Sequence, residues 1–184
     1  PAEAQLSSSA ASPSTSDHHQ EKRVQSCLHD LAKTARAFGD LAEKRVEALA
    51  SRMIQATKLR DDVGQGGSFD RLSYELSESE YASYEAEDPW VSSMLSTMES
   101  HLQWVQDLLT SHNYEALVHA LLGLVAKKME DVVLSKKFNQ LGGLLLDRDV
   151  RNIVNYTSSF TQRTVRDKFA RLTQVATLLN LESP

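Results

Sequence analysis

The 184-residue chain contains a single cysteine, Cys27, and only seven glycines and four prolines. One cysteine can form neither an internal disulfide nor a thiolate metal cage, which fits a reducing compartment such as the cytosol. So few turn-forming residues argue against a sandwich or barrel of many strands, because such folds need a turn roughly every 8 to 12 residues. The sequence therefore disfavours an all-β fold.

Long apolar runs and an excess of basic charge are missing as well. No apolar stretch approaches the roughly 20 residues that span a bilayer, and residues 1–20 contain no apolar core of the kind found in signal peptides. The 20 Lys and Arg residues are outnumbered by 25 Asp and Glu, so no general attraction to phosphate backbones is expected. We therefore expect no nucleic-acid partner and only peripheral contact with membranes.

Signatures of catalysis and of metal binding are also absent from the sequence. It contains no G-x-x-x-x-G-K, G-x-S-x-G or H-E-x-x-H motif. His101, His112 and His119 do not have the spacing of three or four residues that places two ligands on one helical face. We expect no catalytic residues, no cofactor and no metal, and hence a protein that is not an enzyme.

The sequence does have apolar residues that recur at a spacing of about 3.6, which is typical of amphipathic helices. The first such run predicts one long helix from about Gln20, and its apolar positions are Val24, Leu28, Leu31, Ala35, Phe38, Ala42, Val46, Leu49 and Met53. Residues 1–19 are rich in Ser, Ala and Pro and have almost nothing to bury, so we interpret them as a disordered linker. The helical domain is expected to fill residues 20–182.

Four further helical segments follow from the same pattern. Phe69, Leu72 and Leu76 form a short helical stripe, and Asp88-Pro89-Trp90 resembles a helix start because Asp can cap free amides while Pro fits the first turn. A further helix is expected over residues 113–138, and its middle, from Leu117 to Val125, is apolar around most of its circumference, which predicts a buried core helix. Gly142-Gly143 then permit a reversal, and Asp147 can cap a last helix over residues 147–180. The expected fold is an all-α antiparallel bundle of about five helices.

Two charged regions are candidates for interaction with partners. The acidic stretch from Glu75 to Asp88 is either a solvated loop or a surface that docks on a basic partner. The last predicted helix carries Arg166, Asp167, Lys168, Phe169 and Arg171. The charged side chains among them, together with Arg163, form either an exposed charged face or, for Arg166 and Arg171, buried ion pairs with segments beyond Pro184. Trp90, Trp104 and Tyr156 are further candidates for anchors of a partner.

Particular residues also suggest a family. The run Phe138-Asn139-Gln140-Leu141-Gly142-Gly143-Leu144 and the later Val165-Arg166-Asp167-Lys168-Phe169-Ala170-Arg171-Leu172 resemble the C-terminal region of the fourth subunits of the conserved oligomeric Golgi complex. The segment Tyr84-Glu85-Ala86-Glu87-Asp88-Pro89-Trp90-Val91 is similar to an acidic D-P-W-V segment of the same family. These matches occur in the family's order and cover about residues 24–182.

This resemblance implies a non-enzymatic subunit of a multisubunit tethering complex, built as rods of stacked helical bundles and active in intra-Golgi retrograde transport. The implied partners are other subunits of the complex and the SNARE machinery, and the implied location is the cytoplasmic face of the Golgi membrane. In this family the chain continues past the position of Pro184, so we expect the domain to be truncated at its C-terminal end and Arg171 to be more exposed here. The alternative is a generic helical scaffold or an adaptor protein of another tethering complex.

Overall fold

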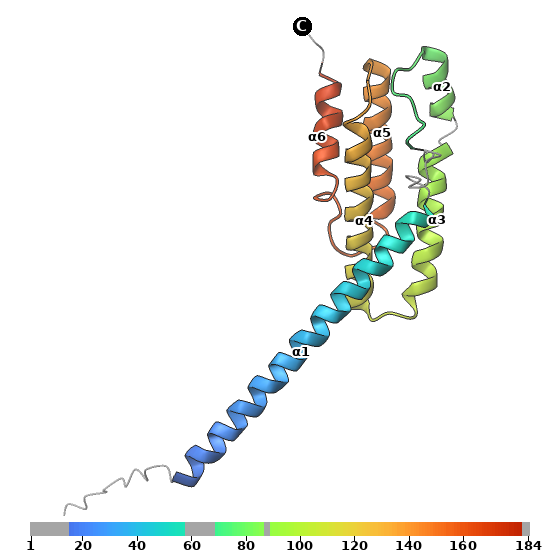
Figure 1. The fold of residues 1–184 in the computed structure, drawn as a ribbon. Coiled ribbons are helices and arrows are strands. Elements are labelled where there is room, and N and C mark those ends of the chain that lie inside the picture. The colour runs from blue at the N-terminus through green and yellow to red at the C-terminus, as the bar shows by residue number, and fades with distance from the viewer. Residues whose placement is uncertain (1–14, 58–68, 87–88, 182–184) are drawn as a thin grey trace, which may run out of the picture. The chain divides into compact units, whose positions relative to one another are not determined.

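A computed structural model describes residues 15–57, 69–86 and 89–181 of the chain. In these ranges it contains six helices, which are α1 (Thr15–Ala56), α2 (Glu78–Ala86), α3 (Pro89–Gln106), α4 (Ser111–Val133), α5 (Gln140–Thr157) and α6 (Ala170–Leu179) (Figure 1). The described residues form no strand, and their only β pairing is an isolated bridge between Tyr74 and Phe138. The predicted all-α helical bundle is confirmed.

The chain divides into two compact units, and the boundary follows Leu41, within α1. In the first unit the described residues belong to one helix, and every residue from His19 to Leu41 is exposed. The apolar residues predicted for this face do form a stripe, with Leu31 exposed to 66% and Phe38 to 68%. The first unit therefore presents an uncovered amphipathic helix.

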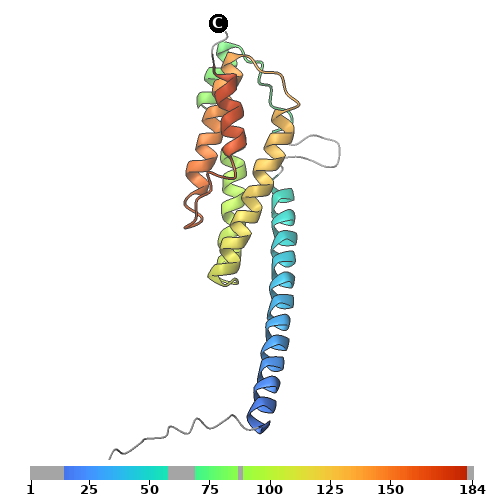
Figure 2. The same cartoon turned by 90° about the vertical axis from the view of Figure 1, so that its left-hand side faces the viewer.

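The second unit, which begins at Ala42, holds the core. Successive helices from α3 to α6 alternate in direction and stand side by side (Figures 1 and 2). Helix α4 packs on α3 and α6, while α5 packs on α2, α3 and α6. Leu117, Val118, Leu121, Leu122 and Val125 of α4 are completely buried, so the prediction of a core helix in this region is confirmed.

The end of α1 also contributes to this core. Val46, Ala50, Met53 and Ile54 are buried, in contrast to the exposed stripe earlier in the same helix. The repeat of about 3.6 residues continues through both parts, which is why the sequence alone predicts one helix without showing where burial begins. Helix α1 starts at Thr15, so residues 15–19 are helical and only residues 1–14 of the expected linker lie outside the described residues.

The expected single helix over residues 147–180 is wrong, because α5 and α6 are separate elements. After α5, the hydroxyls of Ser158 and Ser159 donate to the carbonyls of Val154 and Tyr156 at 2.6 Å each. Such local hydrogen bonds compete with continuation of the helix. Val165 and Phe169 in the connecting segment are buried, so they supply the regular apolar spacing without being helical.

The expected start of that helix is also wrong. Gly142 and Gly143 lie in the first turn of α5 instead of forming a reversal, and the cap is Asn139, whose Oδ1 accepts from the Gly142 N–H at 2.9 Å. Asp147 lies within α5, where it pairs with Arg151 at 2.8 Å. Asparagine suits this role as well as aspartate does.

The region between α1 and α3 differs from the expectation as well. Phe69, Leu72 and Leu76 are buried, but the chain around them forms turns and not a helix. The Lys136 ammonium donates to the carbonyl oxygens of Asp70 and Leu72. Part of the acidic stretch, taken as a solvated loop or a docking surface, is helix α2, where the Glu80 carboxylate accepts from the Ser77 N–H at 2.8 Å.

Candidate interaction surfaces

The predicted helix start at Asp88-Pro89-Trp90 yields a core contact and not an open surface. Helix α3 does begin at Pro89, while Asp88 lies outside the described residues. Trp90 is buried, its indole N–H donates to Asp149 Oδ2 at 3.1 Å, and its ring lies 4.5 Å from that of Phe69. Arg148 in turn donates to Asp149 Oδ1 at 2.9 Å and so compensates the buried carboxylate.

Gly142 and Gly143 permit two close approaches of the backbone at the start of α5. A Cβ atom on Gly142 would lie 1.8 Å from the carbonyl oxygen of Tyr74, and one on Gly143 would lie 2.9 Å from Asn180 Oδ1. Asn139 adds a third link, since its Nδ2 donates to the carbonyl of Leu76 at 2.6 Å. Gly142 and Gly143 therefore allow the start of α5 to pack closely against Tyr74 and Asn180 inside the second unit.

The candidates from Arg166 to Arg171 lie in the segment that joins α5 to α6 and at the start of α6. Phe169 is completely buried and packs into the hydrophobic core beneath this segment. Asp167 and Lys168 pair at 3.9 Å on the surface. Arg171 is 65% exposed and lies 3.4 Å from Glu130 of α4, so its ion pair is within the chain, and surface pairs of this kind contribute little to stability.

Arg166 lines a groove of about 420 Å³ between α5 and α6. The groove is formed by Val150, Arg151, Val154, Asn155, Arg166, Ala170 and Thr173. The sequence pattern identifies Val150 and Val154 as inward positions, but it predicts no groove, because a single straight helix would have placed residues 150 and 170 far apart. The break between α5 and α6 brings them together.

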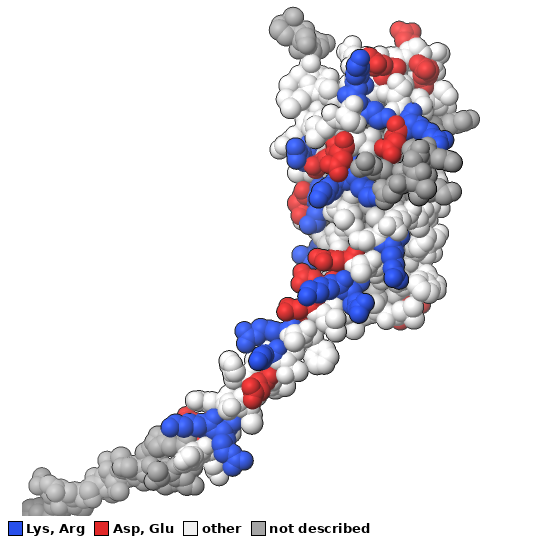
Figure 3. All heavy atoms as spheres, in the orientation of Figure 1, with Lys and Arg blue, Asp and Glu red and all other residues white. Residues whose placement is uncertain are grey.

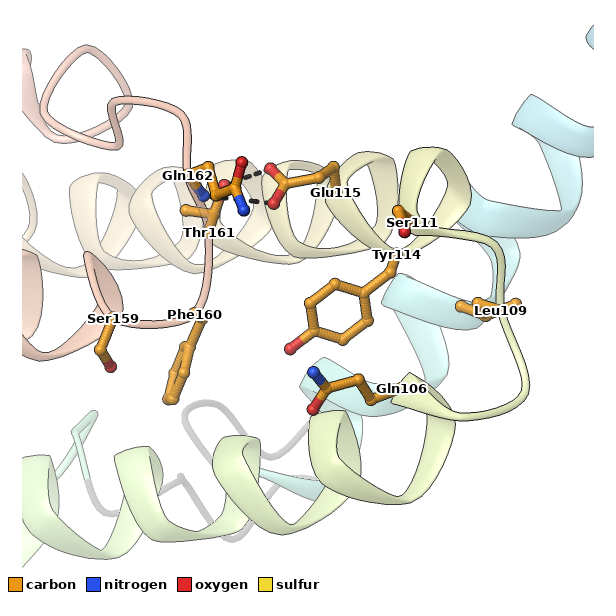
Figure 4. A pocket seen from close by; sticks show the side chains of 9 residues that line it. All are labelled: Gln106, Leu109, Ser111, Tyr114, Glu115, Ser159, Phe160, Thr161 and Gln162. Carbon is orange, nitrogen blue, oxygen red and sulfur yellow. Dashed lines mark hydrogen bonds between the residues drawn. The ribbon is translucent and has the colours of Figure 1, made fainter.

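A second, polar pocket of about 330 Å³ lies where α3, α4 and the segment after α5 meet. Figure 4 shows Glu115 of α4 pointing at Thr161 and Gln162, while Tyr114, Phe160 and Gln106 face the space below them. The Thr161 hydroxyl donates to Glu115 Oε2, and the Gln162 N–H donates to Oε1 at 3.2 Å. His119 Nε2 lies 3.4 Å from the same hydroxyl.

The electrostatics of this pocket follow from its partial burial. Burial alone would raise the pKa of Glu115, but the hydrogen bonds from Thr161 and Gln162 and the nearby His119 and Arg163 lower it below its usual 4.5. Burial, together with Arg163 and Lys168, lowers the pKa of His119 below 6.5, although Glu115 and Asp167 act in the opposite direction. The Glu115 carboxylate and the neighbouring His119, both on α4, thus bind the connecting segment through Thr161 and Gln162.

The other two aromatic candidates remain at the surface. Trp104 is 71% exposed at the edge of a small groove with Leu49, Met53 and Val105. Tyr156 is 40% exposed, donates to Glu99 Oε2 at 2.6 Å and packs edge-on against Phe160. The hydrogen bond to Glu99 raises the pKa of the Tyr156 phenol. Trp104 and Tyr156 are therefore available on the surface for contact with a partner.

Charges that are segregated along the sequence are mixed in the fold. Residues 72–126 contain no Lys or Arg, while residues 127–184 are basic overall. Across the second unit, however, Arg148 donates to the carbonyl of Tyr84 at 2.9 Å, and Figure 3 shows blue and red side chains beside one another on the same face. Among the described residues no cluster of His, Cys, Asp and Glu is suited to a metal ion. None of the described helices is both long and apolar enough to cross a membrane.

Comparison with known proteins agrees with these features. A family model described as conserved oligomeric Golgi complex subunit 4, C-terminal, matches residues 3–184. Conserved oligomeric Golgi complex subunit 4 of Arabidopsis thaliana is 43% identical over 88% of this chain and 21% of that protein. The human subunit 4 is 37% identical over 88% of this chain and 20% of that protein. Subunit 4 of Caenorhabditis elegans is 25% identical over 89% of this chain and 20% of that protein.

The chain thus spans about a fifth of the length of the curated relatives that it matches. The residues that suggested the resemblance lie within the matched range, and they include the Gly142-Gly143 contact, the buried Trp90 and the segment from Arg166 to Arg171. The chain belongs to the family formed by the C-terminal region of conserved oligomeric Golgi complex subunit 4.

Proposed function

We propose that this chain is part of a non-enzymatic subunit of the Golgi vesicle-tethering complex and acts in intra-Golgi retrograde transport through protein–protein interactions. The match to the C-terminal model of subunit 4 supports membership of this complex. The partners are the other subunits of the complex and, for the capture of vesicles, the SNARE machinery. The subunit works at the cytoplasmic face of the Golgi membrane as a peripheral component.

The observation that carries this proposal is the exposed apolar stripe of the first unit, formed by Val24, Leu28, Leu31, Ala35 and Phe38. Exposed Leu and Phe side chains at helical spacing are typical of a face that another helix covers.

The flanks of this apolar stripe indicate what covers it. In a helix that pairs with a single partner helix, the positions beside the seam commonly carry charges that set the pairing. Here the corresponding positions include Cys27, Ala32, Thr34 and Gly39, which are uncharged. The uncharged face is therefore wide enough to contact two helices at once. We assign it to a pair of adjacent, uncharged helix faces on a neighbouring subunit of the complex, as in stacked helical bundles.

The test compares two substitutions in the full-length subunit, each of which places an aspartate in the same stretch of α1. Leu31→Asp lies in the apolar stripe and should abolish co-purification with the other complex subunits. In cells depleted of the native subunit, this variant should also fail to restore Golgi morphology. Lys33→Asp lies on the charged side of the helix and should leave both unchanged. Equal co-purification of both variants with the other subunits would contradict the proposal. It would also be contradicted if Lys33→Asp assembled normally into the complex and yet failed to restore Golgi morphology.

A further inference from the structure

The groove between α5 and α6 combines an apolar floor with a basic rim. Val150 is buried, Val154 is half-buried, and Ala170 is exposed at the first residue of α6, so the floor is narrow and aliphatic. Its volume of about 420 Å³ falls in the range of roughly 300 to 1,000 Å³ that is typical of ligand pockets. The small side chain of Ala170 keeps the space open.

The charges on the rim have one sign. Arg151 and Arg166 line the groove, and no carboxylate does. Arg151 is already paired with Asp147 at 2.8 Å. Arg166 makes no ion pair within the described ranges 15–57, 69–86 and 89–181, although it is exposed and close to the apolar floor. A guanidinium in this position can hold a carboxylate through two parallel hydrogen bonds.

We propose that this groove binds a peptide segment of a partner protein in which aliphatic side chains are flanked by carboxylates. The aliphatic side chain enters between Val154 and Ala170, and a carboxylate pairs with Arg166. Burial of the aliphatic group supplies affinity, whereas the charges supply orientation and selectivity. Asn155 and Thr173 at the rim offer polar groups to the peptide backbone. This site belongs to the second unit and goes beyond the assembly function assigned to the apolar stripe.

The experiment measures binding of two fluorescent peptides to the full-length subunit by anisotropy. The first is Asp-Glu-Leu-Leu-Glu-Asp, and the second carries the same leucines between lysines. We expect binding of the acidic peptide only. Arg166→Glu should weaken this binding at least tenfold by reversing the charge, and Ala170→Trp should do so by filling the groove. Lys137→Glu is the control, because Lys137 is exposed, carries the same charge and does not line the groove.

Unchanged thermal unfolding of the three variants shows that the fold is intact. The proposal is overturned if the subunit binds neither peptide or both alike, or if Lys137→Glu weakens binding as much as Arg166→Glu. It is also overturned if Arg166 is required for sedimentation with phosphatidylserine vesicles while the acidic peptide does not bind, because the ligand would then be a membrane. A failure of this test leaves complex assembly through Leu31 unaffected, so the two proposals can fail separately.

Discussion

Gly142 is a residue at which the fold leaves no space for a side chain. Its backbone lies against the backbone of Tyr74, which the Asn139 N–H also contacts through a hydrogen bond of 3.1 Å to the Tyr74 carbonyl. Two segments that are far apart in sequence therefore meet without a side chain between them. Since the obstacle is backbone and not the end of a flexible side chain, it cannot rotate away.

Gly142→Ala should destabilise the chain by about 3 kcal/mol or more, because the methyl group has no space beside the Tyr74 carbonyl. The measurement is the free energy of unfolding in urea. Gly123→Ala is the control, since nothing lies within 4 Å of the new Cβ atom and Gly123 is within α4. It should stabilise the chain by roughly 0.5 to 1 kcal/mol, as expected for Gly to Ala in a helix. Equal effects of both substitutions would contradict this account of Gly142.

Single residues also show what the sequence can predict. Pro89 correctly marks a helix start because the proline signal is local. The hydrogen bond between Trp90 and Asp149 joins residues 59 positions apart, and no local pattern indicates it. For the same reason the sequence reveals Glu115 and Thr161 as polar residues but does not place them in one pocket.

At the scale of elements, the connection between α5 and α6 is the decisive feature, because it lines both the groove between these helices and the polar pocket. Apolar spacing of 3.6 continues through it, because Val165 and Phe169 are buried like helical core residues. Only the serine hydroxyls after Thr157 signal the break, and serine is too common in helices for this signal to be decisive. Periodicity therefore predicted the helical content correctly and the boundaries wrongly.

The polar pocket that holds this connection should make stability depend on pH. The pKa of His119 is lowered in the fold, mainly by burial and then by Arg163 and Lys168, so the unfolded chain takes up a proton first as the pH falls below about 6.5. Stability should therefore decrease from pH 7 to pH 5. The lowered pKa of Glu115 acts in a separate window, below 4.5, where protonation removes its contribution.

Replacing His119 tests this dependence. In His119→Gln the melting temperature should fall less between pH 7 and pH 5 than in the unchanged chain, because the group that titrates in this range is gone. The measurement is thermal unfolding followed by circular dichroism at both pH values. His112→Gln serves for comparison, since His112 is exposed in the first turn of α4 and should retain the original pH dependence. An identical fall in all three chains would refute the role of His119.

At the scale of the whole molecule, the two units differ in what stabilises them. The described helix of the first unit buries none of its residues from His19 to Leu41, whereas the second unit contains the hydrophobic core. Isolated helices have only local hydrogen bonds and helix propensity, which give marginal stability in water. The sequence could not show this difference, because an apolar stripe has the same pattern whether or not it is covered.

Hydrogen exchange should reveal this contrast. In this chain, amides of residues 24–38 should exchange at least about 100-fold faster than those of Leu117 to Val125 in α4, because local opening of an exposed helix costs little free energy. Mass spectrometry of exchanged peptides gives both rates in one sample. On addition of the assembled neighbouring subunits, protection should rise in residues 24–38 and stay constant in α4. Comparable protection of both regions in the chain alone would be incompatible with an uncovered helix.

The links between the start of α5 and the chain before α2 have a consequence for synthesis in the cell. Lys136 and Asn139 contact backbone carbonyls of Asp70, Leu72 and Leu76 across 63 to 66 residues. At ribosomal rates of about 5 to 20 residues per second, the earlier segment waits on the order of 3 to 13 s for its partners to emerge. During that interval the segment around Leu72 and Leu76 lacks the contacts from Lys136 and Asn139, so a nascent chain paused between residues 76 and 136 exposes apolar side chains that a chaperone can bind.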